Sequence, residues 1–273
     1  MNSRKIVYSL PNPSDLVAIV ARPSKQIKSP YCADILKDEK SYIAHTPSLG
    51  CCKLVDAGCQ VFVQERKENN AKTQYAVYGT YVHDNITVGV HPMVANPMMR
   101  EILRKHMDDE WKDIVMIETE VVYKDSRIDF CVKRANGKRV WIEVKNVPLA
   151  AYEDKATKDY RSICIPKDGQ DPYAKIAIFP DGYRKHKEDP VSPRATKHLA
   201  TLADCVAQGD EAYCIYITQR GDVSSFTPSK LDPVYRAQFL ASQEQGVRMR
   251  CYSVVWDNHF QHAYFTKQIP IVL

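Results

Sequence analysis

The segment between residues 127 and 146 constrains the fold most, because its apolar residues alternate with polar ones on both sides of a turn signal, Asn136-Gly137. The alternating residues are Ile128, Phe130 and Val132 before the turn and Val140, Ile142 and Val144 after it. A period of two predicts two antiparallel strands with one face in a core. Both apolar sets reach the same core only if even-numbered residues face even-numbered ones. We therefore expect a three-residue loop with Gly137 in the left-handed conformation, rather than a two-residue turn.

This register places two carboxylates and a lysine on one face of the hairpin. Asp129 faces Glu143 across the strands, and Lys145 lies two residues further along. Carboxylates on neighbouring strands can hold Mg²⁺, which accepts phosphate oxygens and lowers the pKa of a bound water. A lysine beside them can orient that water and offset charge on a phosphoryl group. The alternative is a cross-strand ion pair on a solvated face. Trp141 and the helices predicted on either side favour a covered cleft.

Residues 1–87 are predicted to form a small β-barrel or sandwich. Short β segments alternate there with clusters of Pro, Ser, Asn and Gly, and helical periodicity is absent. The segments lie at residues 5–8, 16–22, 61–64 and 75–82. A change of pattern near residues 85–90 predicts a domain boundary.

Residues 88–273 are predicted to form an α/β domain. Helices are expected after Asn96-Pro97, Ser192-Pro193 and Asp232-Pro233, with Asn96 and Ser192 as N-caps. Strands are expected at residues 115–123, 128–133, 139–147, 212–218 and 247–255. From Asn96 to residue 218 the predicted order is therefore helix, three strands, helix, strand. The polar stretches at about 149–175 and 182–192 are expected to be surface insertions.

Composition limits the class of protein. Hydrophobic residues make up 44% and charged residues 26%, typical of a globular protein, and neither a membrane span nor a signal peptide is recognisable. The net charge of +5 permits a polyanionic partner without requiring one. The nine cysteines lack C-x-x-C spacing, so we expect reduced thiols and an intracellular protein, cytoplasmic or nuclear and not secreted. A metal cluster of Cys51, Cys52, Cys59 and His45 is conceivable, but buried apolar thiols are favoured over it.

Short motifs occur in a fixed order along residues 16–255. They are AHTPSLG (44–50), DAG (56–58), VGV (88–90), Asn96, Arg100-Glu101, RIDF (127–130), IEVKNV (142–147), FPD (179–181), KHL (197–199), QR (219–220) and DPVY (232–235). Together they resemble the sugar fermentation stimulation protein (SfsA) family. The resemblance implies an N-terminal OB-like β-barrel followed by a PD-(D/E)xK restriction-endonuclease-like α/β domain with a mixed central sheet. Asp129, Glu143 and Lys145 match the acidic and lysine motif of that nuclease fold.

The same resemblance implies a DNA-binding protein. Because the triad is intact, Mg²⁺-dependent hydrolysis of phosphodiester bonds is the leading prediction, with Mn²⁺ as an alternative metal. The partner would be single- or double-stranded DNA bound without strong sequence preference. A non-catalytic DNA-binding transcriptional regulator of sugar metabolism and an RNA-processing nuclease are the alternatives. No membrane partner is expected, and a homodimer is compatible with the sequence.

Further residues are candidates for binding metal or nucleic acid. Glu101 or Glu120 can complete the metal site, although Glu101 suits a solvated position equally well. The basic residues expected to contact nucleic acid are Arg22, Lys25, Arg127, Arg194, Lys197 and His198. The last three share one face near a helix N-terminus, which suits a phosphate, and the alternative is a solvated basic face.

Arg22, Lys25 and Lys28 can form, together with the strand residues Tyr75, Tyr78 and Tyr81, a basic and aromatic surface on which single strands stack. Tyrosines on strands are more often ordinary half-buried residues, and that interpretation is favoured.

Overall fold

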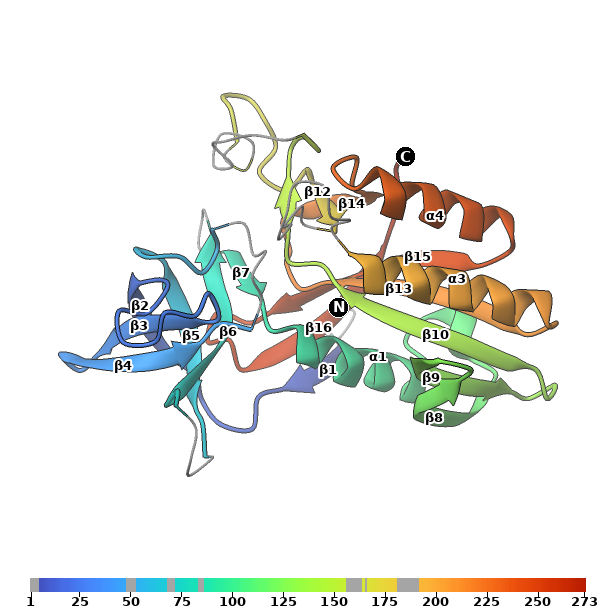
Figure 1. Ribbon diagram of the computed structural model, residues 1–273, viewed down its shortest axis with the longest axis horizontal. Helices are drawn as coiled ribbons and strands as arrows, with labels where there is room; N and C mark the ends of the chain where they lie inside the picture. The colour runs from blue at the N-terminus through green and yellow to red at the C-terminus, as the bar shows by residue number, and fades with distance from the viewer. Residues whose placement is uncertain are drawn as a thin grey trace.

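The computed structural model describes residues 5–47, 53–67, 72–82, 86–155, 164, 166–180 and 192–273. Within these ranges the chain forms a small β-barrel beside a larger layered α/β body (Figure 1). Cys51, Cys52 and much of the two predicted insertions lie outside the described residues. In the part that is described, no helix has the length and apolar character needed to cross a membrane.

Five strands close the barrel, because each of them pairs with two neighbours. The ladder runs β2–β3–β4–β6–β5 and returns to β2, with β4 and β6 parallel and the other pairs antiparallel. The strands are β2 (Asp15–Ala21), β3 (Cys32–Lys37), β4 (Lys40–His45), β5 (Gln60–Glu65) and β6 (Tyr75–Val82). Apolar residues such as Val17, Ile35 and Val63 fill the interior. The predicted OB-like barrel is confirmed, although β3 and β4 were not among the predicted strands.

A mixed seven-stranded sheet forms the second body, in the order β1-β16-β15-β13-β10-β9-β8. Its strands are β1 (Lys5–Ser9), β8 (Ile114–Tyr123), β9 (Ser126–Arg134), β10 (Arg139–Asn146), β13 (Glu211–Thr218), β15 (Arg248–Trp256) and β16 (His262–Ile269). β10, β13 and β15 are parallel, and their connections cross over through helices. The predicted α/β domain with a mixed sheet is therefore confirmed.

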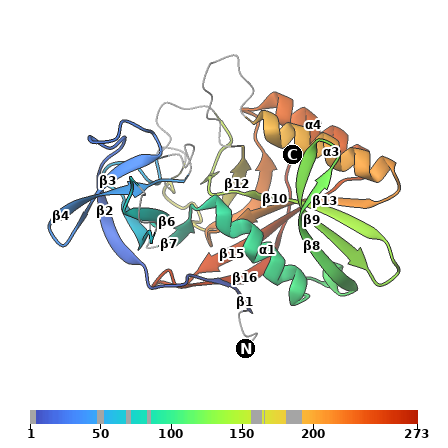
Figure 2. The ribbon, with the colours of Figure 1, turned by 60° about the horizontal axis from the view of Figure 1, so that its bottom comes forward.

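Within the described residues, helices α1, α3 and α4 cover the two faces of this sheet (Figures 1 and 2). α1 (Ala95–Arg104) packs on one face through Met98, Met99 and Ile102. α3 (Pro193–Ala207) and α4 (Pro233–Glu244) cover the other face. β7 (Ile86–Gly89) extends the barrel sheet beside β6. Smaller elements complete the α/β body: the 3₁₀ turns Pro92–Val94 and Asp109–Trp111, and a separate sheet of β11 (Ala150–Ala151), β12 (Lys175–Phe179) and β14 (Val223–Pro228).

The first strand corrects the predicted domain division. Residues 5–9 were expected in the barrel, but β1 pairs with β16 at the edge of the large sheet. The barrel therefore begins at β2. The physical reason is that β16 offers an edge to pair with, and such a long-range partner leaves no local trace in the sequence.

The hairpin has the predicted register. Val140 pairs with Val132 and Ile142 with Phe130, and Gly137 has φ of 87°. The prediction of one shared core is wrong for Ile128, which packs beneath α3 while Phe130 and Val132 pack toward α1. The β8–β9 pair changes direction at this point. The cause is Glu120 of β8, which has a positive φ of 55° and lies between Thr119 and Val121, the partners of Phe130 and Ile128.

Two predicted helix caps are also corrected. α1 begins at Ala95, directly after a 3₁₀ turn, so Asn96 lies inside the first turn and does not cap it. The Ser192 side chain forms no capping bond either. Instead Asp232 serves both helices: its Oδ1 accepts from the N–H of Tyr235 in α4, and its Oδ2 accepts from the N–H of Ser192 before α3.

The barrel joins the sheet through a close backbone approach at Gly89. The N–H of Gly89 donates to the carbonyl of Gln219 at 2.8 Å, and Val88 forms an isolated bridge with Arg220. A Cβ at position 89 would lie 2.1 Å from Oε1 of Gln219 and 2.6 Å from Nε1 of Trp256. These two side chains are buried and hydrogen-bonded to each other, so neither can yield freely.

Replacing Gly89 with alanine is expected to lower the free energy of unfolding by about 1–3 kcal/mol, the usual cost of overpacking a closed contact. Denaturant unfolding measures this loss. Gly221→Ala is the matched control, because its Cβ would meet only a methyl group of Val255 at 3.1 Å. Equal losses in the two variants would contradict the proposed role of Gly89.

Candidate active site

Asp129 lies where β9 and β10 separate. The ladder between these strands ends at the Phe130–Ile142 pair. Beyond it, Oδ2 of Asp129 accepts from the N–H of Val144 at 2.7 Å, and Oδ1 accepts from Nδ2 of Asn96 at 2.8 Å. The Asp129 side chain thus takes the place of a strand partner for β10 and ties α1 to the sheet.

Glu143 of β10 is enclosed against α3. It is 3% exposed, and its Oε1 accepts from Nζ of Lys145 and is hydrogen-bonded to Nδ1 of His198 in α3. Its Oε2 is buried and has no hydrogen-bond partner within the described part of the chain. A buried carboxylate oxygen without a donor is costly, so this atom marks a place where a cation or a donor would be stabilised.

The two carboxylates have different electrostatic environments. Burial raises the pKa of Asp129 and the charge of Glu143 raises it further, against the hydrogen bonds from Val144 and Asn96. For Glu143, burial also favours the neutral acid, but His198 and Lys145 outweigh it and hold the pKa below its ordinary value. Neighbouring carboxyl groups whose pKa values are pushed in opposite directions are characteristic of acid–base and metal sites.

A cavity of about 620 Å³ opens beside Asp129, between β1, α1 and the β8–β9 pair. Glu101 and Glu120, the two predicted third ligands, both line it. Glu101 is paired with Arg104 and Lys105, which hold its pKa at about 2, and Glu120 is paired with Arg127 at 2.7 Å. Among the described residues, no three His, Cys, Asp or Glu side chains are placed to hold one metal ion. The two glutamates thus lie near Asp129 without joining it as ligands.

The predicted basic residues do not all lie at one place. His198 contacts Glu143, and Nε of Arg194 lies 3.5 Å from Nε2 of His198, so both belong to the site. Lys197 points instead to Asp125, at 2.7 Å. Arg22 and Lys25 lie in the barrel, outside this site, where Arg22 is paired with Asp56 and hydrogen-bonded to the carbonyl of Pro30.

Sequence reasoning missed what Asn96 and His198 do. Asn96 was interpreted as a helix cap, although its side chain holds Asp129. His198 was grouped with a phosphate-binding face, although it holds Glu143. Nothing local in the sequence pairs either residue with its partner, which lies 33 residues away for Asn96 and 55 residues away for His198. The thiols of Cys32, Cys131, Cys205, Cys214 and Cys251 are free.

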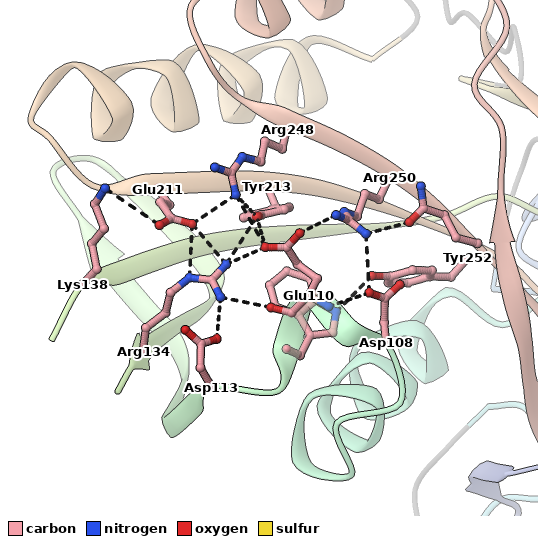
Figure 3. Close-up of polar contacts among 12 residues, drawn as sticks. Asp108, Glu110, Asp113, Arg134, Lys138, Glu211, Tyr213, Arg248, Arg250 and Tyr252 are labelled. Carbon is pink, nitrogen blue, oxygen red and sulfur yellow. Dashed lines mark hydrogen bonds and ion pairs between the residues drawn. The ribbon is translucent and has the colours of Figure 1, made fainter. Parts of the chain in front are cut away.

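A second charged cluster lies at the opposite end of the sheet, where β13 and β15 begin (Figure 3). It includes Asp108, Glu110, Asp113, Arg134, Lys138, Glu211, Arg248 and Arg250. Glu110 pairs with three arginines and also accepts from Tyr213 Oη at 2.6 Å, so its charge is fully compensated. This cluster contrasts with Glu143, and we interpret it as structural.

The fold consists of a closed five-stranded barrel beside a mixed sheet that helices cover. Two acidic residues and a lysine lie where two strands of this sheet separate. These features define a two-part α/β protein with a candidate acidic site. A family model described as the sugar fermentation stimulation protein RE domain matches residues 93–158 and 171–260. The chain belongs to the sugar fermentation stimulation protein family.

Similar proteins agree with this assignment. The sugar fermentation stimulation protein homolog of Desulfitobacterium hafniense (strain DSM 10664 / DCB-2) is 28% identical over 232 residues, which are 84% of each chain. The homolog of Pelagibacter ubique is 28% identical over 225 residues, 81% of this chain and 84% of the other. The solved structure of Pyrococcus furiosus SfsA in complex with Ca²⁺ superposes with a TM-score of 0.77 over 98% of this chain and all of that one, at 17% identity. This last likeness shows a shared fold.

Replacing Glu143 with glutamine is expected to lower the pKa of Asp129, because the change removes the nearby negative charge that raises it. A carbon-13 NMR titration of the carboxyl groups in EDTA measures the shift. Glu101→Gln is the control, since Glu101 is not among the groups that shift the pKa of Asp129. An unchanged pKa of Asp129 in Glu143→Gln would show that the two carboxylates are not coupled.

Proposed function

We propose that this protein binds DNA and hydrolyses its phosphodiester bonds with Mg²⁺ or Mn²⁺, at a site formed by Asp129, Glu143 and Lys145. The observation that carries the proposal is the enclosed carboxylate of Glu143, whose Oε2 has no partner within the described ranges although a lysine and a histidine bind Oε1. A purely structural ion pair would be expected to use both oxygens, as Asp222 does with Arg220 and Lys175.

The donor set fits a hard divalent cation. Mg²⁺ is usually held by one or two carboxylates and completes its shell with water and substrate phosphates, so Asp129 and Glu143 are sufficient protein ligands. A cation between them would also relieve the repulsion that raises the pKa of Asp129. The Pyrococcus furiosus relative was solved in complex with Ca²⁺, another cation that prefers oxygen ligands. When bound, the metal would polarise a phosphate and lower the pKa of a water.

Side chains around the two carboxylates would hold the metal ligands and the attacking water in place. Asn96 and the N–H of Val144 fix both oxygens of Asp129, and His198 fixes Glu143. Lys145, 13% exposed in its side chain, lies against Glu143, where it can orient a water and offset charge on the phosphoryl group. Arg100 lines the cavity beside Asp129 and is suited to contact the DNA backbone.

One observation favours a second candidate, a DNA-binding regulator without catalysis. Both oxygens of Asp129 already accept N–H bonds, and no three-ligand group is formed among the described residues. The same carboxylates would then stabilise the junction of α1, β9 and β10. Cleavage and binding experiments separate the two functions.

Labelled single- and double-stranded DNA is expected to be cut by the native chain with Mg²⁺ or Mn²⁺ and not with EDTA. Asp129→Ala, Glu143→Ala and Lys145→Ala should each reduce the rate by more than about 100-fold, because each removes a group at the metal or the reacting phosphate. Glu244→Ala, at the exposed end of α4, is the control and should cut at the native rate. DNA that is bound equally by all variants and never cut would establish the regulator, and cutting of RNA alone would reassign the substrate.

Binding of random DNA in EDTA is expected to weaken about tenfold or more between 50 and 200 mM salt, because phosphate contacts release counterions. Arg100→Ala should reduce the slope of log affinity against log salt by about 0.9, the loss of one contact. Lys40→Ala, which removes an equal charge from a barrel residue outside both cavities, should leave the slope unchanged. Binding that does not depend on salt would contradict a nucleic-acid partner.

A further inference from the structure

A second cavity lies where the barrel meets the segment leading to α1. Its volume is about 620 Å³, and it shares no lining residue with the cavity at Asp129. The side chains that matter here are Asn12, His45, Gln64, Arg66, Tyr78 and His91. It therefore combines imidazoles, amides, a guanidinium and an aromatic ring within a space of the size that small ligands occupy.

The hollow is a consequence of the barrel register. His45 of β4 and Gln64 of β5 both pair with Ala76 of β6, so the three residues stand side by side. Because Ala76 is the smallest of them, its position leaves a depression between the two longer side chains. Tyr78 lies two residues further along β6 and lines the same cavity.

An aromatic wall bounds the cavity. The rings of Tyr78 and His91 are stacked, with centroids 4.5 Å apart and planes at 17°. The backbone N–H groups of Val90 and His91 both donate to the carbonyl of Tyr78, which fixes the stack. Nδ1 of His91 is buried and has no hydrogen-bond partner in the part of the chain that is described. A ring nitrogen of this kind in a cavity wall can serve a ligand.

The charges that face this space are mainly positive. Arg66 and Lys67 follow β5 at the mouth, and Glu65 is the acidic residue among the lining side chains. Burial, together with the charges of His45 and Arg66, lowers the pKa of His91 to about 4. Burial and Arg66 also lower the pKa of His45. His91 is therefore uncharged at neutral pH, and the positive charge that would attract an anion belongs to Arg66 and Lys67.

We propose that this cavity binds a nucleotide, with Arg66 and Lys67 contacting its phosphate and the Tyr78–His91 stack lying against its base. Arginine is suited to phosphate through paired N–H bonds, and aromatic rings stack on bases without sequence preference. This inference rests on the DNA binding in the proposed function and adds a site that uses none of the residues at Asp129 or Glu143. The site would hold one nucleotide of a strand at the barrel, apart from any bond that is cut.

Isothermal titration calorimetry with 5′-deoxyadenosine monophosphate in EDTA tests the proposal in the full chain without involving metal. Arg66→Ala is expected to weaken binding by about tenfold or more, since it removes charge-assisted hydrogen bonds to the phosphate. His91→Phe keeps the stacked ring and removes both nitrogens, and should weaken binding with the fold retained, as thermal unfolding would show. Lys40→Ala makes the same charge change as Arg66→Ala on the barrel outside this cavity, and should bind as the native chain does.

Adenosine and inorganic phosphate complete the experiment. Each is expected to bind more weakly than the nucleotide, because each engages only half of the site. The proposal is overturned if adenosine binds as tightly as the nucleotide, since the phosphate would then be irrelevant, or if phosphate alone does so, since the site would be for small anions. It is also overturned if Asp129→Ala abolishes binding and Arg66→Ala does not, because the nucleotide would then lie in the other cavity.

Discussion

The carboxylate of Asp129 ties together three elements on which the site depends. It accepts an N–H of β10 where the β9–β10 ladder ends, and it accepts the amide of Asn96 at the start of α1. A backbone N–H released by two separating strands would otherwise lack a partner in a half-buried place. The strands can therefore separate with this N–H satisfied, and the same side chain also lines the cavity between β1, α1 and the β8–β9 pair.

Glu143 is a buried carboxylate of which only one oxygen is hydrogen-bonded within the described residues. Removing a carboxylate from water is unfavourable unless partners surround it. Lys145 and His198 supply partners for one oxygen, and the second oxygen has none among the described residues. At the opposite end of the sheet, Glu110 is surrounded by three arginines and a tyrosine. The difference between these two glutamates separates a site that can accept a further ligand from one that is complete.

Local patterns predicted the parts of the site that lie within one hairpin. The alternation of apolar residues and the left-handed Gly137 fixed the pairing of β9 with β10, because a shift by one residue would expose every buried side chain. The same patterns did not predict the turn of the strand at Ile128, since its cause lies in Glu120 of a different strand. Nor did they predict the hydrogen bond from Asn96 to Asp129, because an asparagine suits a helix cap as well as a contact between distant parts of the fold.

The sequence by itself determined the β-rich character of the N-terminal part, the order from α1 through β8, β9, β10 and α3 to β13, the hairpin register and the acidic and lysine residues that the hairpin carries. Each of these depends on periodicity or turn chemistry within short stretches of chain. Only the tertiary structure decided that His198 reaches Glu143, that Glu101 and Glu120 are held by basic neighbours, and that β1 leaves the barrel for the large sheet. These contacts join residues far apart in sequence, and their partners are chosen by packing around the whole sheet, which no local pattern encodes.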